Sequence, residues 1–259
     1  MKINERENTV FRRSKILESI EEEGQLRVHE LSERFGVSVV TIRNDLIQLE
    51  KKNLLIRTHG GAIKEKRVNI DFALSQKTKM NTDEKLRIAK KAVEFIKEGD
   101  TIILDSGSTT QLIAKQIKNF KNITVLTNAL NIVATLSDSK DLEIIIPGGI
   151  LRKRSLSLIG PIAEISVNNF SVDKLFLGVD GIDPQYGITT PNLEEAHLNR
   201  IMIERSKEIF VVTDSSKFEK QSMALITDLE NIDVLITDTK IKENHKEQCL
   251  NKNVRVITV

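Results

Sequence analysis

The first pattern along the chain is a set of apolar positions at intervals of three to five residues, interrupted once at Gly36. This spacing is typical of helices with one buried face. Glycine tolerates the positive φ of a tight turn, and the hydroxyl of Ser38 can cap the helix that follows. A helical pattern, a glycine turn, a capping serine and a second helical pattern, in this order, predict a helix-turn-helix. The apolar positions are Leu26, Leu31, Phe35, Val37, Ile42, Leu46 and Leu49.

The second of these helices carries side chains suited to reading DNA. A buried stripe of Ile42, Leu46 and Leu49 leaves other residues of its N-terminal end away from the core, namely Val39, Thr41, Arg43 and Asn44. Arginine makes bidentate contacts with guanine, asparagine does so with adenine, and threonine can contact a phosphate or a thymine methyl group. The alternative is a small helical bundle whose exposed face happens to carry arginine and asparagine.

A short apolar run after this helix favours the DNA-binding interpretation. Residues 54–57 resemble a strand that enters the turn His59-Gly60-Gly61-Ala62. A hairpin at this position is the wing of a winged helix, and Arg57 and His59 on it are expected to face phosphates. We therefore expect a winged helix-turn-helix DNA-binding domain over residues 1–62.

The polar residues 63–79 lose this periodicity and predict a linker. A helix is expected from an N-cap at Asn81 to Gly99. Short apolar runs then alternate with helical patterns, which predicts an α/β domain over residues 80–259 with a mostly parallel sheet. The expected strands are 101–104, 123–126, 143–146, 174–179, 209–212, 234–236 and 254–259.

Small polar residues follow the predicted strands, and ligands of such sheets bind at the carboxyl ends of the strands. The loop after the first strand combines a glycine, hydroxyls and the N-terminus of the next helix, which together can hold an anion. It is no nucleotide P-loop, because the Gly-rich stretch that ends in Lys-Ser or Lys-Thr is absent. The residues of this candidate phosphate cradle are Asp105, Ser106, Gly107, Ser108, Thr109 and Thr110.

Later loops add amide, carboxylate and cationic groups, an inventory that suits a phosphorylated polyol. Glu195 can point into the same pocket from the segment 191–202. The alternative for each loop is ordinary turn chemistry, since Gly, Ser, Asn and Asp favour turns. The further candidates are Asn128, Gly148, Gly149, Arg152, Asp180 and Lys217.

Composition excludes several classes of protein but does not identify a binding partner. The 259 residues carry a net charge of +2, and residues 1–70 hold 14 basic and 11 acidic side chains, so the DNA interpretation depends on pattern rather than bulk charge. Cys249 is the single cysteine, which excludes an internal disulfide and is expected to be inert. His197 and His245 are expected at the surface, without metal-ligand spacing. Neither a membrane span nor a signal peptide is evident, and we expect a cytoplasmic protein.

These motifs, in this order, resemble the DeoR family of bacterial transcriptional repressors. The resemblance is carried by residues 41–46, 59–62, 105–110, 127–128, 148–149, 178–183 and 214–217. It implies a winged helix-turn-helix followed by a sensor domain similar to ribose-5-phosphate isomerase, in which a phosphorylated sugar controls DNA affinity. No other cofactor and no metal are implied.

The resemblance also assigns roles to residues. Operator contacts would come from Ser38, Thr41, Arg43, Asn44 and Arg57. The phosphate would bind to Ser106, Ser108, Thr109 and Thr110, joined by Lys217. The sugar would contact Arg152, Asn128, Asp180 and Glu195.

Asn44 stands where many members of the family have a second arginine. With residues 192–195 and 199–200, it makes the chain similar to the subgroup of the N-acetylgalactosamine repressor. The implied effector is galactosamine 6-phosphate or its N-acetyl form. Since one short DNA-binding module contacts too little DNA for specificity, a homodimer or homotetramer on a double-stranded operator is expected.

Two other functions remain open at this point. A phosphosugar isomerase would use Glu195 or Asp180 as its base, although such an enzyme needs no DNA-reading helix. A winged helix that binds protein instead of DNA would lack the steep salt dependence that counterion release produces.

Overall fold

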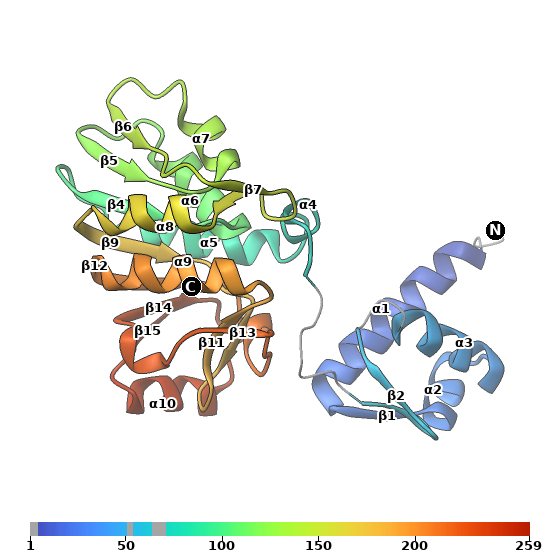
Figure 1. The fold of residues 1–259 in the computed structure, drawn as a ribbon. Helices are drawn as coiled ribbons and strands as arrows, with labels where there is room; N and C mark the ends of the chain where they lie inside the picture. Colours follow the sequence, from blue (N-terminus) through green and yellow to red (C-terminus); the bar gives the residue numbers. More distant parts are fainter. Residues whose placement is uncertain (1–4, 51–53, 64–70) are drawn as a thin grey trace. The chain divides into compact units, whose positions relative to one another are not determined.

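The computed structural model describes residues 5–50, 54–63 and 71–259. The chain divides into two compact units, Met1–Asn69 and Ile70–Val259 (Figure 1). Of the expected linker 63–79, residues 64–70 lie outside the described part. Among the described residues, no helix combines the length and the apolar character that a membrane span requires.

The first unit is a winged helix-turn-helix, as expected. Its sheet has the order β1-β3-β2 with antiparallel pairing, and the β2–β3 hairpin forms the wing. Its elements are α1 (Glu5–Glu23), β1 (Gln25–Arg27), α2 (Val28–Phe35), α3 (Val39–Glu50), β2 (Ile56–Thr58) and β3 (Gly61–Ile63).

Two details of this unit differ from the sequence-based expectation. Leu26 does not begin the first helix but lies in β1, paired with Ala62. An additional helix, α1, precedes it, and Ile16 and Ile20 on that helix are buried against α2 and α3. The two helices of a helix-turn-helix cannot enclose a core alone, so a third helix and the sheet complete it.

The second unit is built on a seven-stranded sheet in which every pairing is parallel, in the order β15-β14-β12-β9-β4-β5-β6. Each expected strand lies in this sheet, β4 and β5 with the expected bounds and the others with bounds that differ by one to three residues. The strands are β4 (Thr101–Leu104), β5 (Ile123–Leu126), β6 (Leu142–Ile145), β9 (Val172–Leu177), β12 (Ser206–Val212), β14 (Val234–Thr237) and β15 (Arg255–Thr258).

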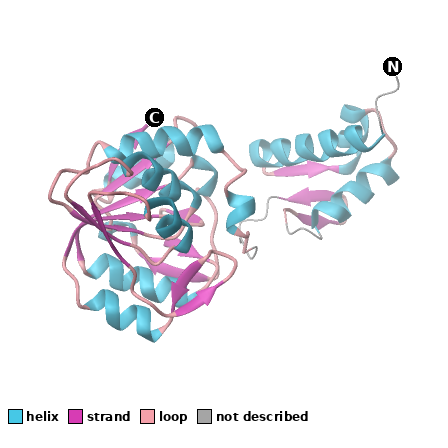
Figure 2. Ribbon diagram, turned by 90° about the horizontal axis from the view of Figure 1, so that it is seen from above, coloured by secondary structure: helices cyan, strands magenta, loops and turns pink. Residues whose placement is uncertain are grey.

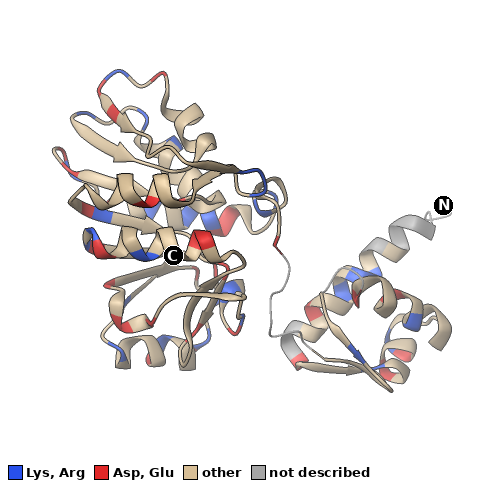
Figure 3. Ribbon diagram, viewed as in Figure 1, with Lys and Arg blue, Asp and Glu red and all other residues tan. Residues whose placement is uncertain are grey.

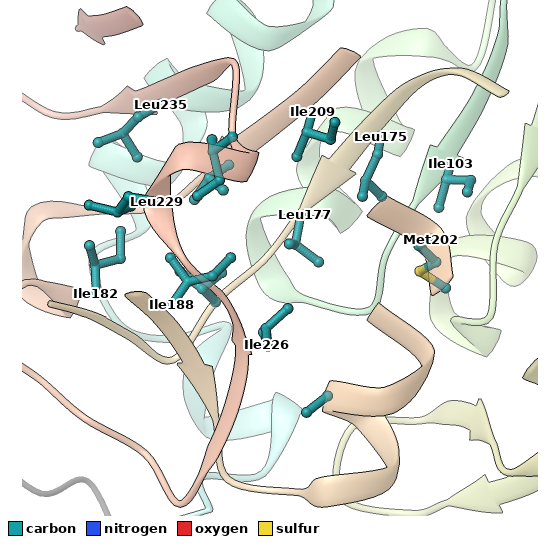
Figure 4. Close-up of a cluster of buried hydrophobic side chains, with 14 of the residues drawn as sticks. Ile103, Leu175, Leu177, Ile182, Ile188, Met202, Ile209, Ile226, Leu229 and Leu235 are labelled. Atoms are coloured by element: carbon teal, nitrogen blue, oxygen red, sulfur yellow. The ribbon is translucent and has the colours of Figure 1, made fainter. Parts of the chain in front are cut away.

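Helices cover both faces of this sheet (Figure 2). On β4, Ile102 and Leu104 belong to the core that includes α5, α6 and α7, whereas Ile103 belongs to the core on the opposite face, which includes residues of α8, α9 and α10. Figure 4 shows side chains of this second face, Met202 of α9 among them. The helices are α5 (Thr82–Val93), α6 (Ser108–Ile117), α7 (Leu130–Leu136), α8 (Pro161–Asn168), α9 (Leu193–Glu204) and α10 (Glu243–Asn251).

Short antiparallel strands and two 3-10 turns complete the unit, and the sequence pattern did not predict them. They are too short to show the alternation that identifies a strand. The hairpin is β7 (Ile150–Arg152) with β8 (Ser157–Ile159). A second sheet contains β10 (Gly181–Asp183), β11 (Gly187–Thr190) and β13 (Ala224–Thr227), and the turns are η1 (Ser215–Lys217) and η2 (Leu229–Asn231).

Residues 71–79 are not a linker but part of the second unit. They contain the short helix α4 (Leu74–Lys77), whose Leu74 side chain is buried and whose Leu74 N–H donates to the Arg154 carbonyl at 2.8 Å. Asn81 occupies the N-cap position of α5, as expected, but its side chain makes no capping hydrogen bond. It has φ +50°, and its amide donates to Asp214 Oδ1 at 2.7 Å.

Candidate nucleic-acid interface and anion site

Helix α3 presents the side chains expected to read DNA. Gly36 ends α2 with φ +61°, and the Thr41 N–H donates to Ser38 Oγ at 3.1 Å, so the predicted turn and cap are both present. Ile42, Leu46 and Leu49 are buried as expected. Arg43 and Asn44 are exposed. The helix therefore offers a bidentate donor and an amide to solvent from its N-terminal half.

A buried ion pair that the sequence analysis missed holds α3 against α1. Asp45, on α3, is only 2% exposed, and its oxygens accept from Arg12 Nε at 2.6 Å and from Arg13 Nε at 2.7 Å. Two guanidinium groups satisfy the carboxylate that burial removes from water. The contact fixes the rotation of α3 and thus the direction in which Arg43 points.

Val39 and Arg57, two other candidates for DNA contact, each contact neighbouring residues of their own unit. Val39 is half-buried against the core of its unit rather than lying away from it. Arg57 is exposed on the wing beside His59, and its guanidinium lies 3.4 Å from Glu50 Oε2. An exposed pair of this length is weak, so a phosphate can compete for Arg57. Contact of these residues with DNA stays a prediction.

In the second unit, the candidate loops meet where the order of the strands reverses. From β4 the chain continues to β5 and β6 on one side, while β9 lies on the other side of β4. Such a switch point is where open α/β sheets bind ligands. A Cβ on Gly178 would lie 3.4 Å from the Ser106 carbonyl oxygen, so a glycine lets the loops after β4 and β9 approach closely.

The loop after β4 leads directly into α6. Ser108, Thr109 and Thr110 occupy the first turn of this helix and are buried. The Thr110 hydroxyl faces the backbone of Gly107, where an added Cβ would lie 3.0 Å from it, and has no hydrogen-bond partner among the described residues. Free N–H groups and the helix dipole favour an anion here.

Asp105 lies beside this loop and is fully buried. The pKa of its carboxyl group is raised to about 7, mainly by burial and also by the negative charge of Glu195, while hydrogen bonds from Ser106, Gly178 and Asn199 oppose the rise. Its charge therefore changes near neutral pH. Asp105 and Glu195 are predicted site residues, whereas Asn199, which lies on α9, was not predicted to belong to the site.

A continuous polar network joins four of the predicted residues. Arg152 Nη1 lies 3.2 Å from Glu195 Oε1, and Lys217 Nζ lies 3.6 Å from Asp180 Oδ1. The hydroxyl of Thr190, which the sequence analysis missed, lies 3.5 Å from both Asp180 and Glu195. The structure thus brings together side chains from four separate segments of the chain.

Lys77 also belongs to this network, although the sequence analysis placed it in a linker. Its Nζ lies 2.7 Å from Asp180 Oδ1. Burial by itself lowers the pKa of Lys77, but the Asp180 carboxylate outweighs it and raises the pKa. Burial raises the pKa of Asp180, and the two ammonium groups of Lys77 and Lys217 reverse that effect, so Asp180 stays ionised.

Lys85, on α5, is a second lysine near this network that was not predicted from the sequence. Its ammonium donates to the backbone carbonyls of Lys77 at 2.5 Å and of Met80 at 2.7 Å. Burial lowers the pKa of Lys85 to about 8. The sequence analysis could not find it, because a lysine inside an amphipathic helix usually faces solvent.

Of the remaining predicted residues, Asn128 has a polar atom that could bind a ligand, whereas the glycines have structural reasons for their positions. Asn128 donates to the Leu158 carbonyl at 3.3 Å, and its own Oδ1 has no partner among the described residues. Gly148 and Gly149 have positive φ, and a Cβ on Gly149 would lie 2.6 Å from the Ile159 carbonyl oxygen. The close approach of β8 therefore explains why a glycine stands at position 149, and no ligand is needed to explain it.

One expectation about histidine is wrong. His245 is buried, stacks on Phe218 with ring centroids 5.1 Å apart, and lies 3.2 Å from Glu219. His197 is exposed as expected. Cys249 is buried, and burial raises the pKa of its thiol to about 11, so the reactive thiolate is disfavoured.

Comparison with known proteins identifies the family. Residues 12–68 match the DeoR-like helix-turn-helix domain, and residues 80–239 match the DeoR C-terminal sensor domain. The chain belongs to the DeoR family. It is a DNA-binding transcriptional regulator, and the isomerase alternative is not supported, because its relatives are regulators rather than enzymes.

Two relatives illustrate the similarity. A protein described as an aga operon transcriptional repressor from Escherichia coli O157:H7 is 40% identical over 97% of this chain and 94% of its own length. The glycerol-3-phosphate regulon repressor of Escherichia coli K12 is 35% identical over 88% of this chain and 90% of its own.

The solved structures that are similar to this chain include a ribose-5-phosphate isomerase in complex with phospho-erythronic acid. It shares 18% identity over 53% of this chain and 54% of its own, with a TM-score of 0.40. A similarity of this size does not indicate a shared activity.

Proposed function

We propose that this DeoR-family regulator represses genes of sugar or amino-sugar catabolism, and that a phosphorylated sugar bound at the carboxyl edge of its parallel sheet controls its affinity for DNA. One observation carries the proposal. The N-terminus of α6, where the Thr110 hydroxyl has no partner among the described residues, lies at the switch point of the sheet with the charged network of Asp180, Glu195 and Arg152.

The two ends of the ligand have separate partners in this proposal. The phosphate binds at the N-terminus of α6, where hydroxyls and backbone N–H groups can donate to it and Lys217 supplies a positive charge. Its expected partners are Ser106, Ser108, Thr109, Thr110 and Lys217. The sugar hydroxyls bind to Asn128, Arg152, Asp180 and Glu195, which offer both donors and acceptors.

The effector we favour is galactosamine 6-phosphate or its N-acetyl form. The relative described as an aga operon repressor supports this choice, since it matches nearly the whole chain. The carboxylates of Asp180 and Glu195 also suit a ligand rich in N–H and O–H donors. Calorimetry with hexosamine and hexose 6-phosphates tests the choice, and equal binding of unphosphorylated sugars would contradict the phosphate site.

A variant of the cradle tests its position. Ser108→Leu with Thr109→Leu fills the first turn of α6, so effector binding should be lost while the affinity for DNA without effector is retained. Ser137→Leu is the matched control, because Ser137 is exposed at the end of α7. Release of DNA by the effector that survives in the double variant would place the effector elsewhere.

The DNA-binding unit supports the second half of the proposal. Arg43 and Asn44 read base edges, Ser38, Thr41, Arg57 and His59 contact phosphates, and two copies engage neighbouring half-sites as a homodimer or homotetramer. By linkage, an effector changes DNA affinity as much as DNA changes effector affinity, typically ~5–150-fold. Selection of bound fragments from random DNA, with and without the phosphosugars, tests both sites together.

A further inference from the structure

Residues 71–80, which we call the connector, lie between the DNA-binding unit and the sheet of the second unit in the sequence. They follow residues 64–70 and lead directly into α5. Any signal that passes along the chain from the effector site to the DNA-binding unit passes through them. Their contacts with the effector site therefore decide whether such a signal can arise.

Two ion pairs fasten the connector to the effector site. Lys77 Nζ lies 2.7 Å from Asp180 Oδ1. Asp71 Oδ2 lies 2.5 Å from Arg152 Nη2, while the other terminal nitrogen of Arg152 lies 3.2 Å from Glu195. The same guanidinium thus serves the connector and the effector site. Figure 3 shows the basic stretch at the β7–β8 turn next to α4.

Hydrogen bonds to backbone groups also hold the connector at both of its ends. Leu74 N–H donates to the Arg154 carbonyl at 2.8 Å, and the Arg154 guanidinium donates to the Asp71 carbonyl. At the end of the connector next to α5, the Lys85 ammonium donates hydrogen bonds to the backbone carbonyls of Lys77 and Met80. Lys85 anchors the end near α5, whereas the end near residue 71 is held by the Asp71–Arg152 pair, by these two hydrogen bonds with Arg154 and by the buried Leu74 side chain.

A phosphosugar acts on both ion pairs for reasons of charge. A phosphate monoester carries about −1.5 to −2 at neutral pH and attracts ammonium groups, while sugar hydroxyls donate to carboxylates. The phosphate therefore competes with Asp180 for Lys77, and the hydroxyls compete with Lys77 for Asp180. Both ends of the ligand weaken the Lys77–Asp180 contact, and hydroxyl oxygens that accept from Arg152 compete with Asp71 for its guanidinium.

We propose that Lys77 and Asp71 are the residues that couple the two sites: in the free protein they hold the connector to Asp180 and Arg152, and the effector changes the DNA affinity by taking those two partners. This inference rests on the proposed function and adds the element that transmits the signal. It predicts that loss of the ion pairs imitates the effector.

The first experiment uses the full chain without effector and a DNA fragment selected from a random pool. Lys77→Met keeps the length of the side chain and removes its charge, and Asp71→Asn removes the other pair. The double variant should change the DNA affinity ~5–150-fold relative to the wild type. Lys79→Met, on the exposed face of the connector, is the matched control and should leave the affinity unchanged. Unchanged affinity in the double variant would overturn the inference.

The second experiment adds galactosamine 6-phosphate or its N-acetyl form. The wild type should shift in the same direction as the effector-free double variant, and the double variant should show little further change while it still binds the sugar in calorimetry. A double variant that responds as fully as the wild type would overturn the coupling role. A wild type that does not respond, beside variants that do shift, would overturn the proposed effector and leave the coupling element standing.

A third measurement keeps the test independent of the stability of the variants. Hydrogen exchange of the wild-type amides of residues 74–80 should become faster when the sugar phosphate binds, because the Leu74 N–H loses its fixed partner at Arg154. Exchange that slows on binding, or stays the same, would show that the connector keeps its contacts and would contradict the proposal.

Discussion

At the scale of single residues, Arg43 is the clearest candidate for base readout. It is exposed on a helix whose rotation is fixed by the buried pair of Asp45 with Arg12 and Arg13. Arg43→Ala should cost ~1–3 kcal/mol of binding free energy and relax the preference at one base pair, since a bidentate contact with guanine would be lost.

Binding to a library of single-base operator variants measures this effect. Arg87→Ala, an exposed arginine on α5 in the other unit, is the control for the loss of one positive charge. A loss that is equal at every base pair would make Arg43 a phosphate contact instead of a base contact.

Asp105 gives a prediction about pH. Its pKa is about 7 in the folded protein, above the ordinary value of 3.8 for the unfolded chain, mainly because the side chain is buried. The folded state therefore binds the proton more tightly, so this residue stabilises the fold at low pH and that contribution is lost as the pH rises through 7. Asp105→Asn removes the titration.

The free energy of unfolding of Asp105→Asn, measured with urea, should rise relative to the wild type between pH 4 and 8, by on the order of 2–4 kcal/mol. The difference should level off above pH 8. Asp83→Asn, an exposed residue on α5, controls for the loss of one carboxylate. A difference that does not depend on pH would contradict the raised pKa.

The sequence revealed those site residues whose signal is local. Ser108, Thr109 and Asp180 follow apolar runs directly, so a rule about strand ends finds them. Lys77 and Asp180 are 103 positions apart, and Asp71 and Arg152 are 81 apart. Neither Lys77 nor Asp71 has a local pattern that marks it, since the ion pairs exist only after the fold brings the segments together.

At the scale of elements, the turn between α2 and α3 offers a matched test. Gly36 and Gly60 both have open space where a Cβ would be added, but only Gly36 has a positive φ, at +61°. Gly36→Ala should lower the free energy of unfolding by ~1–2 kcal/mol, because an L-residue in the left-handed region is strained. Gly60→Ala should change it little. Thermal unfolding of the two variants measures the difference, and equal effects would show that the turn does not depend on backbone conformation.

The elements that could be predicted are those with a long enough pattern. All seven strands of the parallel sheet were found, because buried strands form continuous apolar runs. Helix α1, strand β1 and the short antiparallel strands of the second unit were missed. The connector was read as a linker because its charged side chains, which look solvated in a sequence, are partners for Asp180 and Arg152 in the fold.

At the scale of the whole molecule, the salt dependence of DNA binding separates two ways in which the effector can act. The logarithm of affinity falls with the logarithm of salt concentration, with a slope of about −0.9 for each phosphate contact. If the effector prevents one of two DNA-binding units in a dimer from reaching its half-site, half of the phosphate contacts are lost. The slope with effector should then be about half the slope without it.

If instead the effector rotates α3 within a complex that keeps both units on the DNA, base contacts are lost and the slope stays unchanged. We expect the first outcome, because release of the connector at residue 71 changes where the DNA-binding unit can reach but leaves the internal packing of that unit, held by Asp45, unchanged. Titrations of labelled operator at several salt concentrations, with the mass of the complex measured in parallel, distinguish the two. An unchanged slope would place the action of the effector inside the DNA-binding unit, where the described contacts of the connector do not reach.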